Sequence, residues 1–106
     1  MRFGVKDIVL EKLSEVFEKN IGVIKALLYG SETMGNYFPD GDIEIAIVGD
    51  LNLEELKKIG REIKLLQLPN KFNLCLYHQL EDKYLIEHID RVGVVIYKNK
   101  MADAEN

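Results

Sequence analysis

Residues 30–47 read GSETMGNYFPDGDIEIAI, and this stretch decides the fold. Its last six residues alternate between isoleucines on one side and Asp42 and Glu44 on the other. Successive side chains of a strand point to opposite faces, so the pattern predicts a strand with one buried face and both acids on the other. Carboxylates are costly to bury, so the acids indicate a metal ion or another polar site.

A Gly-Ser pair, Gly30 and Ser31, follows an apolar run at 23–29 that predicts a buried strand. Backbone N–H groups and a hydroxyl at the end of a strand can bind phosphate oxygens. Two carboxylates at i and i+2 can hold one divalent cation or bridge two, and hard oxygen ligands favour Mg²⁺ or Mn²⁺. The combination of Gly30 and Ser31 with Asp42 and Glu44 therefore predicts a nucleoside triphosphate site.

The remaining segments alternate helical and extended patterns. Helices are predicted at 6–19 and at 80–91, and a further helix is predicted to start after Asn52 as N-cap and to end before Pro69. Strands are predicted at 23–29, 42–48, 72–77 and 94–97. We expect an α+β domain of two layers, with a small mixed β-sheet and the helices packed on one face. The domain is expected to span 1–98, with a flexible tail at 99–106.

Composition excludes several classes of protein. The chain has 106 residues, which fits one domain, and a net charge of -4, which disfavours binding to duplex nucleic acid. Cys75 is the single cysteine, so no intrachain disulfide forms, and His78 and His88 complete no zinc-binding spacing. No apolar run is long enough to cross a bilayer, and we expect a soluble, cytoplasmic protein without a membrane partner.

The segment GSETMGNYFPDGDIE resembles the G-S-x-x-x-G-x-x-x-P-D-S-D-x-D motif of the DNA polymerase β-like nucleotidyltransferase superfamily. It resembles in particular the minimal, MNT-type members of that superfamily, and the ending IDRVGVVIYK is similar to their closing segment. The resemblance implies a nucleotidyltransferase fold and transfer of a nucleotidyl group, AMP in the first instance, from ATP to an acceptor hydroxyl. It implies that Gly30 and Ser31 bind the triphosphate and that Asp42 and Glu44 hold Mg²⁺. It also implies a role as the antitoxin of a HEPN-type partner.

Four departures from the family pattern lie around the reacting centre. Glu44 replaces an aspartate, Gly41 replaces a serine, and Glu32 and Met34 replace the arginines of the turn. The third family aspartate aligns with Asn73, which we take as the remaining catalytic position, although an amide cannot accept the hydroxyl proton.

Three hypotheses therefore stay open. The first is an active Mg²⁺-dependent adenylyltransferase, and the second is a weak or inactive module that neutralises its partner by contact. The third is a free-standing homodimer that senses nucleotide, which is a possible homo-oligomer.

Overall fold

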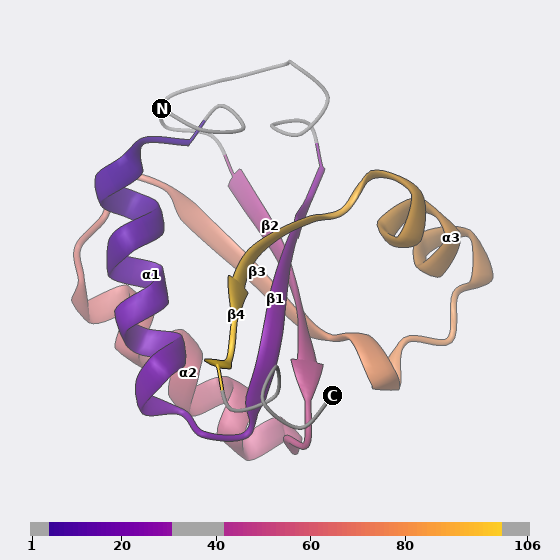
Figure 1. The fold of residues 1–106 in the computed structure, drawn as a ribbon, viewed down its shortest axis with the longest axis horizontal. Coiled ribbons are helices and arrows are strands. Elements are labelled where there is room, and N and C mark those ends of the chain that lie inside the picture. Colours follow the sequence, from indigo (N-terminus) through magenta and orange to yellow (C-terminus); the bar gives the residue numbers. More distant parts are fainter. Residues whose placement is uncertain (1–4, 31–41, 101–106) are drawn as a thin grey trace.

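The computed structural model describes residues 5–30 and 42–100. Three α-helices, one short 3-10 helix and four strands lie within these residues (Figure 1). In chain order they are α1 (Asp7–Lys19), β1 (Val23–Tyr29), β2 (Asp42–Gly49), α2 (Leu53–Leu65), β3 (Lys71–Leu76), η2 (Tyr77–Gln79), α3 (Lys83–Val92) and β4 (Val94–Lys98).

The four strands form one mixed sheet in the order β3-β2-β1-β4. The β1 strand pairs antiparallel with both β2 and β4, and β2 pairs parallel with β3. A parallel pair needs a long crossover connection, and α2 provides it between β2 and β3. The end of β1 and the starts of β2 and β3 therefore lie at the same end of the sheet.

The helices cover both faces of the sheet, which corrects the expectation that all of them pack on one face. The main core joins α1 and α2 to one face, where Ile43, Ile45 and Ile47 of β2 are buried. A second, smaller cluster joins Ile89 of α3 to Tyr29 and to other residues on the opposite face. Figure 1 shows α1 and α2 to one side of the strands and α3 to the other. The helix packs there because the alternation that buries the isoleucines turns Ala46, also fully buried, to the α3 side.

The predicted capping box of α2 is present. The Asn52 side chain accepts a hydrogen bond from the Glu55 amide at 2.9 Å, and the Glu55 carboxylate accepts from the Asn52 amide at 3.0 Å. These two bonds satisfy donors that a helix start leaves open, so the helix begins where the sequence indicates.

The α3 helix begins later than predicted. A 3-10 turn at Tyr77–Gln79 follows β3, and α3 starts at Lys83. The Asp82 side chain accepts hydrogen bonds from the amides of Tyr84 and Leu85, which makes it the N-cap. A carboxylate cap is a stronger start signal than the apolar spacing from which residue 80 was predicted.

Asn20 joins the end of α1 to α2. Its side-chain amide donates to the Val16 carbonyl at 2.7 Å and to Glu62 Oε1 at 2.9 Å, and its oxygen accepts from Lys58 Nζ at 3.0 Å. Asn20 is 8% exposed, so these three bonds satisfy a polar group that would be costly to bury alone.

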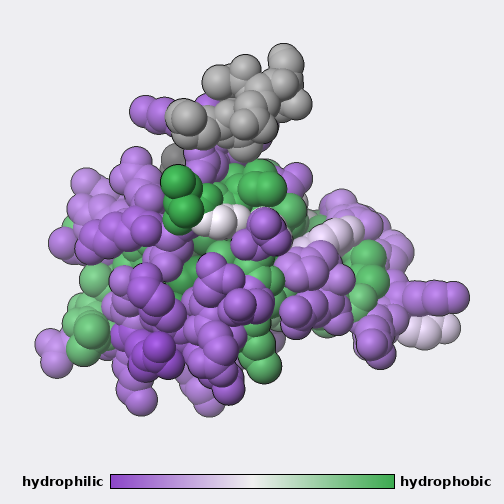
Figure 2. Space-filling view, turned by 90° about the horizontal axis from the view of Figure 1, so that it is seen from below, coloured by the Kyte–Doolittle hydropathy of each residue, from purple (hydrophilic) through white to green (hydrophobic). Residues whose placement is uncertain are grey.

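Hydrophilic side chains cover most of the surface seen in Figure 2, with hydrophobic side chains showing between them. Within the described residues, none of the helices has the length and apolar character needed to cross a bilayer. Of the expected tail at 99–106, residues 101–106 lie outside the described part of the chain, whereas the Asn99 amide donates to the Ile24 carbonyl at 2.8 Å.

Candidate functional site

The two acids lie at the start of β2. Asp42 is exposed and Glu44 is half-buried, whereas Ile43 and Ile45 are buried on the other face. The alternation therefore places both carboxylates on the same face of the sheet, at its solvent-exposed end. At this position the two carboxylates remain in contact with water, so they avoid the full free-energy cost of burying a charge. The neighbouring Ile43 and Ile45 anchor the strand in the hydrophobic core.

The end of β1 lies beside these acids. Tyr29, its last residue, pairs in register with Glu44, and Gly30 follows it directly. Gly30 has φ 122°, a backbone conformation that side chains with a Cβ rarely adopt. The chain therefore turns sharply one residue after the Tyr29–Glu44 pair, as the Gly-Ser pattern predicts. Ser31 and the residues that follow it, up to residue 41, lie outside the described part of the chain.

The β3 strand completes the site on the other side of β2. Its Lys71 pairs in register with Asp42, and its Asn73 pairs with Glu44. The Asn73 amide Nδ2 donates a hydrogen bond to Asp42 Oδ2 at 3.3 Å. Residues 31 positions apart in sequence thus meet at one end of the sheet, and Tyr29, Glu44 and Asn73 form a row across three strands.

Below this row, the Tyr29 hydroxyl and the Cys75 thiol are 3.5 Å apart. Burial raises the pKa of Tyr29 well above its ordinary value, and the charge of Glu44 adds to the increase. Burial is also the main cause that raises the pKa of the Cys75 thiol. The Tyr29 phenol and the Cys75 thiol therefore stay neutral at physiological pH. They form a polar but uncharged group beside the candidate site. His88 of α3 contacts the Tyr29 ring edge-on, with centroids 6.5 Å apart.

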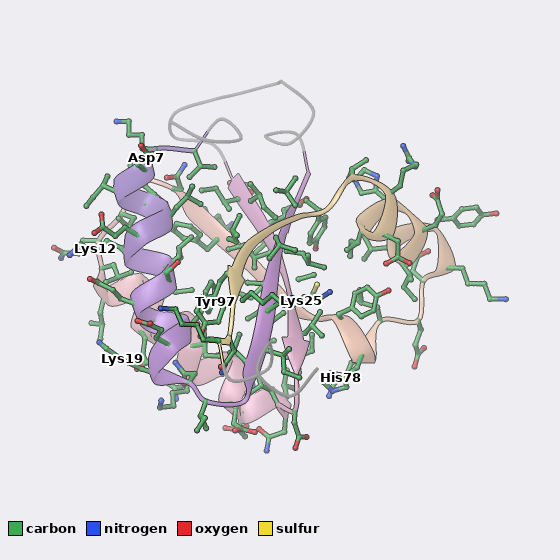
Figure 3. The ribbon with its side chains drawn as sticks, in the orientation of Figure 1. Asp7, Lys12, Lys19, Lys25, His78 and Tyr97 are labelled. Carbon is green, nitrogen blue, oxygen red and sulfur yellow. The ribbon has the colours of Figure 1, made fainter. Side chains whose placement is uncertain are left out.

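The structure brings together four of the five residues that the sequence singles out: Gly30, Asp42, Glu44 and Asn73. The fifth, Ser31, is not among the described residues. His78 lies away from this group, at the other end of β3 (Figures 1 and 3). Lys71 was missed by the sequence analysis, although its position two residues before Asn73 was a usable signal for the same strand face.

The donor set fits a hard divalent cation. Asp42 and Glu44 offer carboxylate oxygens, and the Asn73 side chain has an amide oxygen. Mg²⁺ usually keeps several waters and takes one or two carboxylates plus substrate phosphates, so two acids are enough. No group of three or more His, Cys, Asp or Glu residues suited to a metal occurs among the described residues. The protein part of such a site would therefore consist of Asp42 and Glu44.

The structure thus combines a mixed sheet, a glycine turn at the end of β1 and two acids at the start of β2. The family model described as "Polymerase beta, Nucleotidyltransferase" matches residues 11–102. The chain therefore belongs to the polymerase β nucleotidyltransferase family, as the motif predicted. No curated protein sequence matches the chain.

Solved structures confirm the fold at low sequence identity. A toxin-antitoxin structure with AMP-PNP superposes with a TM-score of 0.68 at 17% identity, covering 91% of this chain and 78% of that one. A tri-AMPylated Shewanella oneidensis HEPN toxin in complex with MNT antitoxin superposes with a TM-score of 0.59 at 15% identity, covering 92% of this chain and 76% of that one. A putative nucleotidyltransferase from Sulfolobus solfataricus superposes with a TM-score of 0.53 at 16% identity, covering 88% of this chain and 83% of that one.

Proposed function

We propose that this protein is a minimal nucleotidyltransferase that transfers a nucleotidyl group, AMP in the first instance, from a nucleoside triphosphate to an acceptor hydroxyl. The observation that carries the proposal is the row at one end of the sheet, where Asp42 and Glu44 lie between the Gly30 turn and Asn73. A cation held by the two acids would neutralise phosphate charge at the point where the glycine turn brings backbone close to a ligand.

The residues take distinct roles in this proposal. Gly30 and Ser31 bind the triphosphate. Asp42 and Glu44 would hold Mg²⁺ or Mn²⁺, and the ion would supply a Lewis acid for the α-phosphate. Asn73 orients the Asp42 carboxylate through its amide hydrogen bond. The acceptor oxygen forms a bond to the α-phosphorus, the bond to the leaving pyrophosphate breaks, and the hydroxyl proton passes to solvent water, because Asn73 cannot accept it.

The partner we propose is a HEPN-type protein, with this chain acting in the cytoplasm as its antitoxin. The support is the fold shared with structures described as toxin-antitoxin complexes, one of them with an MNT antitoxin and an AMPylated HEPN toxin. The identities of 15–17% carry the fold only, so the partner stays part of the proposal.

The test is to mix the protein with ATP labelled on the α-phosphate, Mg²⁺ and the protein encoded beside it. Label should appear on that partner and should disappear with Asp42→Ala. The unchanged fold of Asp42→Ala is checked by circular dichroism, and Asp50→Ala, at the other end of β2, serves as the matched control. Absence of label with the wild-type protein, or equal labelling by Asp42→Ala, would refute the transferase.

A second candidate function is neutralisation by contact without turnover. One observation favours it: the third acidic position is an amide, and that amide is engaged with Asp42. This alternative predicts that Asp42→Ala still forms the complex and still protects cells from the partner. Loss of protection by a variant that still binds would reject it.

A further inference from the structure

Lys71 lies directly beside the candidate acids. It is the first residue of β3, it pairs in register with Asp42, and it is exposed. Strand alternation puts it on the same face as Asn73, two residues later. Adjacent strands lie about 4.8 Å apart, so the flexible four-carbon stem of the lysine can carry its ammonium group over the two carboxylates.

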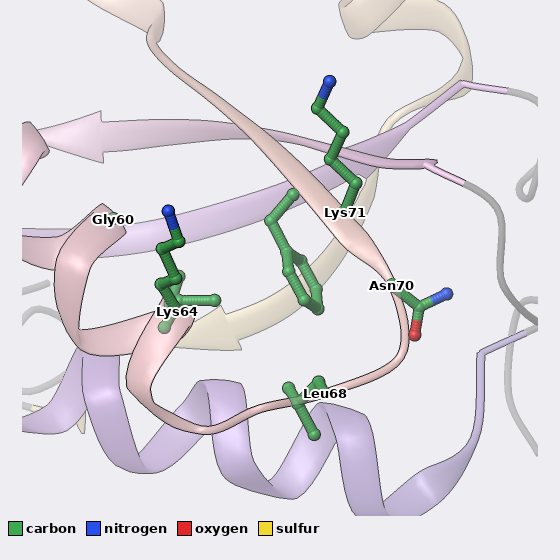
Figure 4. A pocket seen from close by; sticks show the side chains of 7 residues that line it. Gly60, Lys64, Leu68, Asn70 and Lys71 are labelled. Carbon is green, nitrogen blue, oxygen red and sulfur yellow. The ribbon is translucent and has the colours of Figure 1, made fainter.

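Lys71 also borders a pocket of about 410 Å³ between α2 and β3, whose lining includes Ile63, Leu68 and Phe72. In Figure 4, the Lys71 side chain extends from the strand in the direction opposite to Leu68. Strand alternation places Lys71 on the same face as Asn73, which is the face of the acids.

The charge of Lys71 has no acidic partner within the described part of the chain, whereas Lys58 pairs with Glu62 at 3.6 Å and Arg91 pairs with Glu87 at 3.0 Å. The segment 31–41 contains no lysine, arginine or histidine and carries Glu32 and Asp40. This segment therefore offers no cationic side chain to a nucleoside triphosphate bound at the glycine turn. Lys71 is the basic side chain that the described strands bring beside the acids.

We propose that Lys71 binds phosphate oxygens of the nucleotide and supplies the cationic side chain of this site. The inference rests on the proposed function, because it concerns the same nucleotide. The ammonium group interacts with the phosphate from the β3 side of the acids, opposite the Gly30 turn. A simpler role is also known for such residues: lysines on edge strands discourage pairing with other chains, and β3 is an edge strand. That role would not depend on nucleotide.

The two roles are separated by titrating Lys71→Gln with two probes, MnCl₂ alone and Mn²⁺-ATP, in calorimetry at low salt. Removing a positive charge beside Asp42 and Glu44 should leave binding of Mn²⁺ alone unchanged or tighter. The same change should weaken binding of Mn²⁺-ATP about fivefold, a value reduced for the exposure of the lysine. High salt should remove most of the difference because it screens exposed charges.

Two further variants complete the design. Lys71→Arg keeps the charge and should retain most of the affinity for Mn²⁺-ATP. Lys25→Gln makes the same charge change in β1, four residues before Tyr29 and thus about 14 Å along the strand, and should bind Mn²⁺-ATP like the wild type. Figure 3 shows Lys25 in the middle part of the sheet.

The inference is overturned if Lys71→Gln binds Mn²⁺-ATP within twofold of the wild type, or if it loses affinity for Mn²⁺ alone to the same extent. If the wild type binds Mn²⁺-ATP tightly and Lys71→Gln binds it within twofold of the wild type, the proposed function stands without this role for Lys71. Absence of Mn²⁺-ATP binding by the wild type would overturn both proposals.

Discussion

Replacing Asn73 with aspartate should change the stability of the protein in opposite directions with and without a divalent cation. In the wild type, the Asn73 amide donates to Asp42 Oδ2 at 3.3 Å. The Asn73→Asp variant removes this hydrogen bond, worth about 1 kcal/mol. It also places a third carboxylate where the amide was, next to Asp42 and in register with Glu44.

Two unit charges 4 Å apart repel by about 1 kcal/mol in water and by about 4 kcal/mol at an effective dielectric of 20. Asp42 is exposed, so the lower value applies. The metal-free variant should therefore lose about 2 kcal/mol in free energy of unfolding, and a domain of this size should show a decrease in melting temperature of about 10 °C. A third carboxylate should raise the affinity for Mn²⁺ at least tenfold, so that millimolar Mn²⁺ restores much of the lost stability.

The assay is thermal unfolding in EDTA and in Mn²⁺, followed by circular dichroism. Gln79→Glu adds the same charge in η2, beyond the other end of β3, and serves as the control. It should show neither the decrease nor the recovery. An Asn73→Asp variant that is destabilised equally with and without Mn²⁺ would refute the metal site, and one with unchanged stability in EDTA would refute the contact with Asp42.

Three other predictions concern the fold. Ile45 has 0% exposure, so Ile45→Ala should lower the free energy of unfolding by about 3 kcal/mol in a urea titration. Ile21 is 88% exposed, so Ile21→Ala should change this free energy by less than about 0.5 kcal/mol. Equal effects of the two substitutions would contradict the core described. Asn20→Ala should cost about 2 kcal/mol by the same method, because the Val16 carbonyl and Glu62 lose their donor. Burial raises the pKa of the Tyr29 hydroxyl in the folded state above its ordinary value of 10.0. Above pH 10.0 the hydroxyl therefore ionises first in the unfolded state, which lowers the free energy of unfolding as the pH rises. Below pH 10.0 the contribution of this hydroxyl to stability is fully present. Tyr29→Phe should therefore lose less stability than the wild type between pH 9 and pH 11, and parallel pH profiles would refute the burial of this hydroxyl.

The strand bearing the acids could be predicted from sequence because each signal is local. The isoleucine alternation fixes which face of β2 is buried, and the Asn52–Glu55 capping box fixes where α2 begins. Glycine at residue 30 likewise marks a backbone conformation that other residues avoid, which the φ of 122° confirms.

The β3 side of the site depends on tertiary structure and could not be derived from local pattern. Asn73 was predicted only through a family resemblance. The spacing of Lys71 from Asn73 indicates a shared strand face, but the position of Lys71 beside Asp42 follows from the β2–β3 register, which joins residues far apart in sequence. The placement of α3 on the second face was also missed. It depends on Ile89 meeting the small Ala46 beside Tyr29, a contact between residues far apart in sequence.

The most direct test of the central claim is paramagnetic broadening of backbone amide signals by Mn²⁺ in the presence of ATP. Manganese broadens nearby nuclei most, so the signals lost first identify the binding site. We predict early loss of the signals of Gly30, Asp42, Glu44 and Asn73 in the wild type, and no early loss of these signals in the Asp42→Asn variant. First losses at the acidic residues of α1, or the same pattern in wild type and variant, would contradict it.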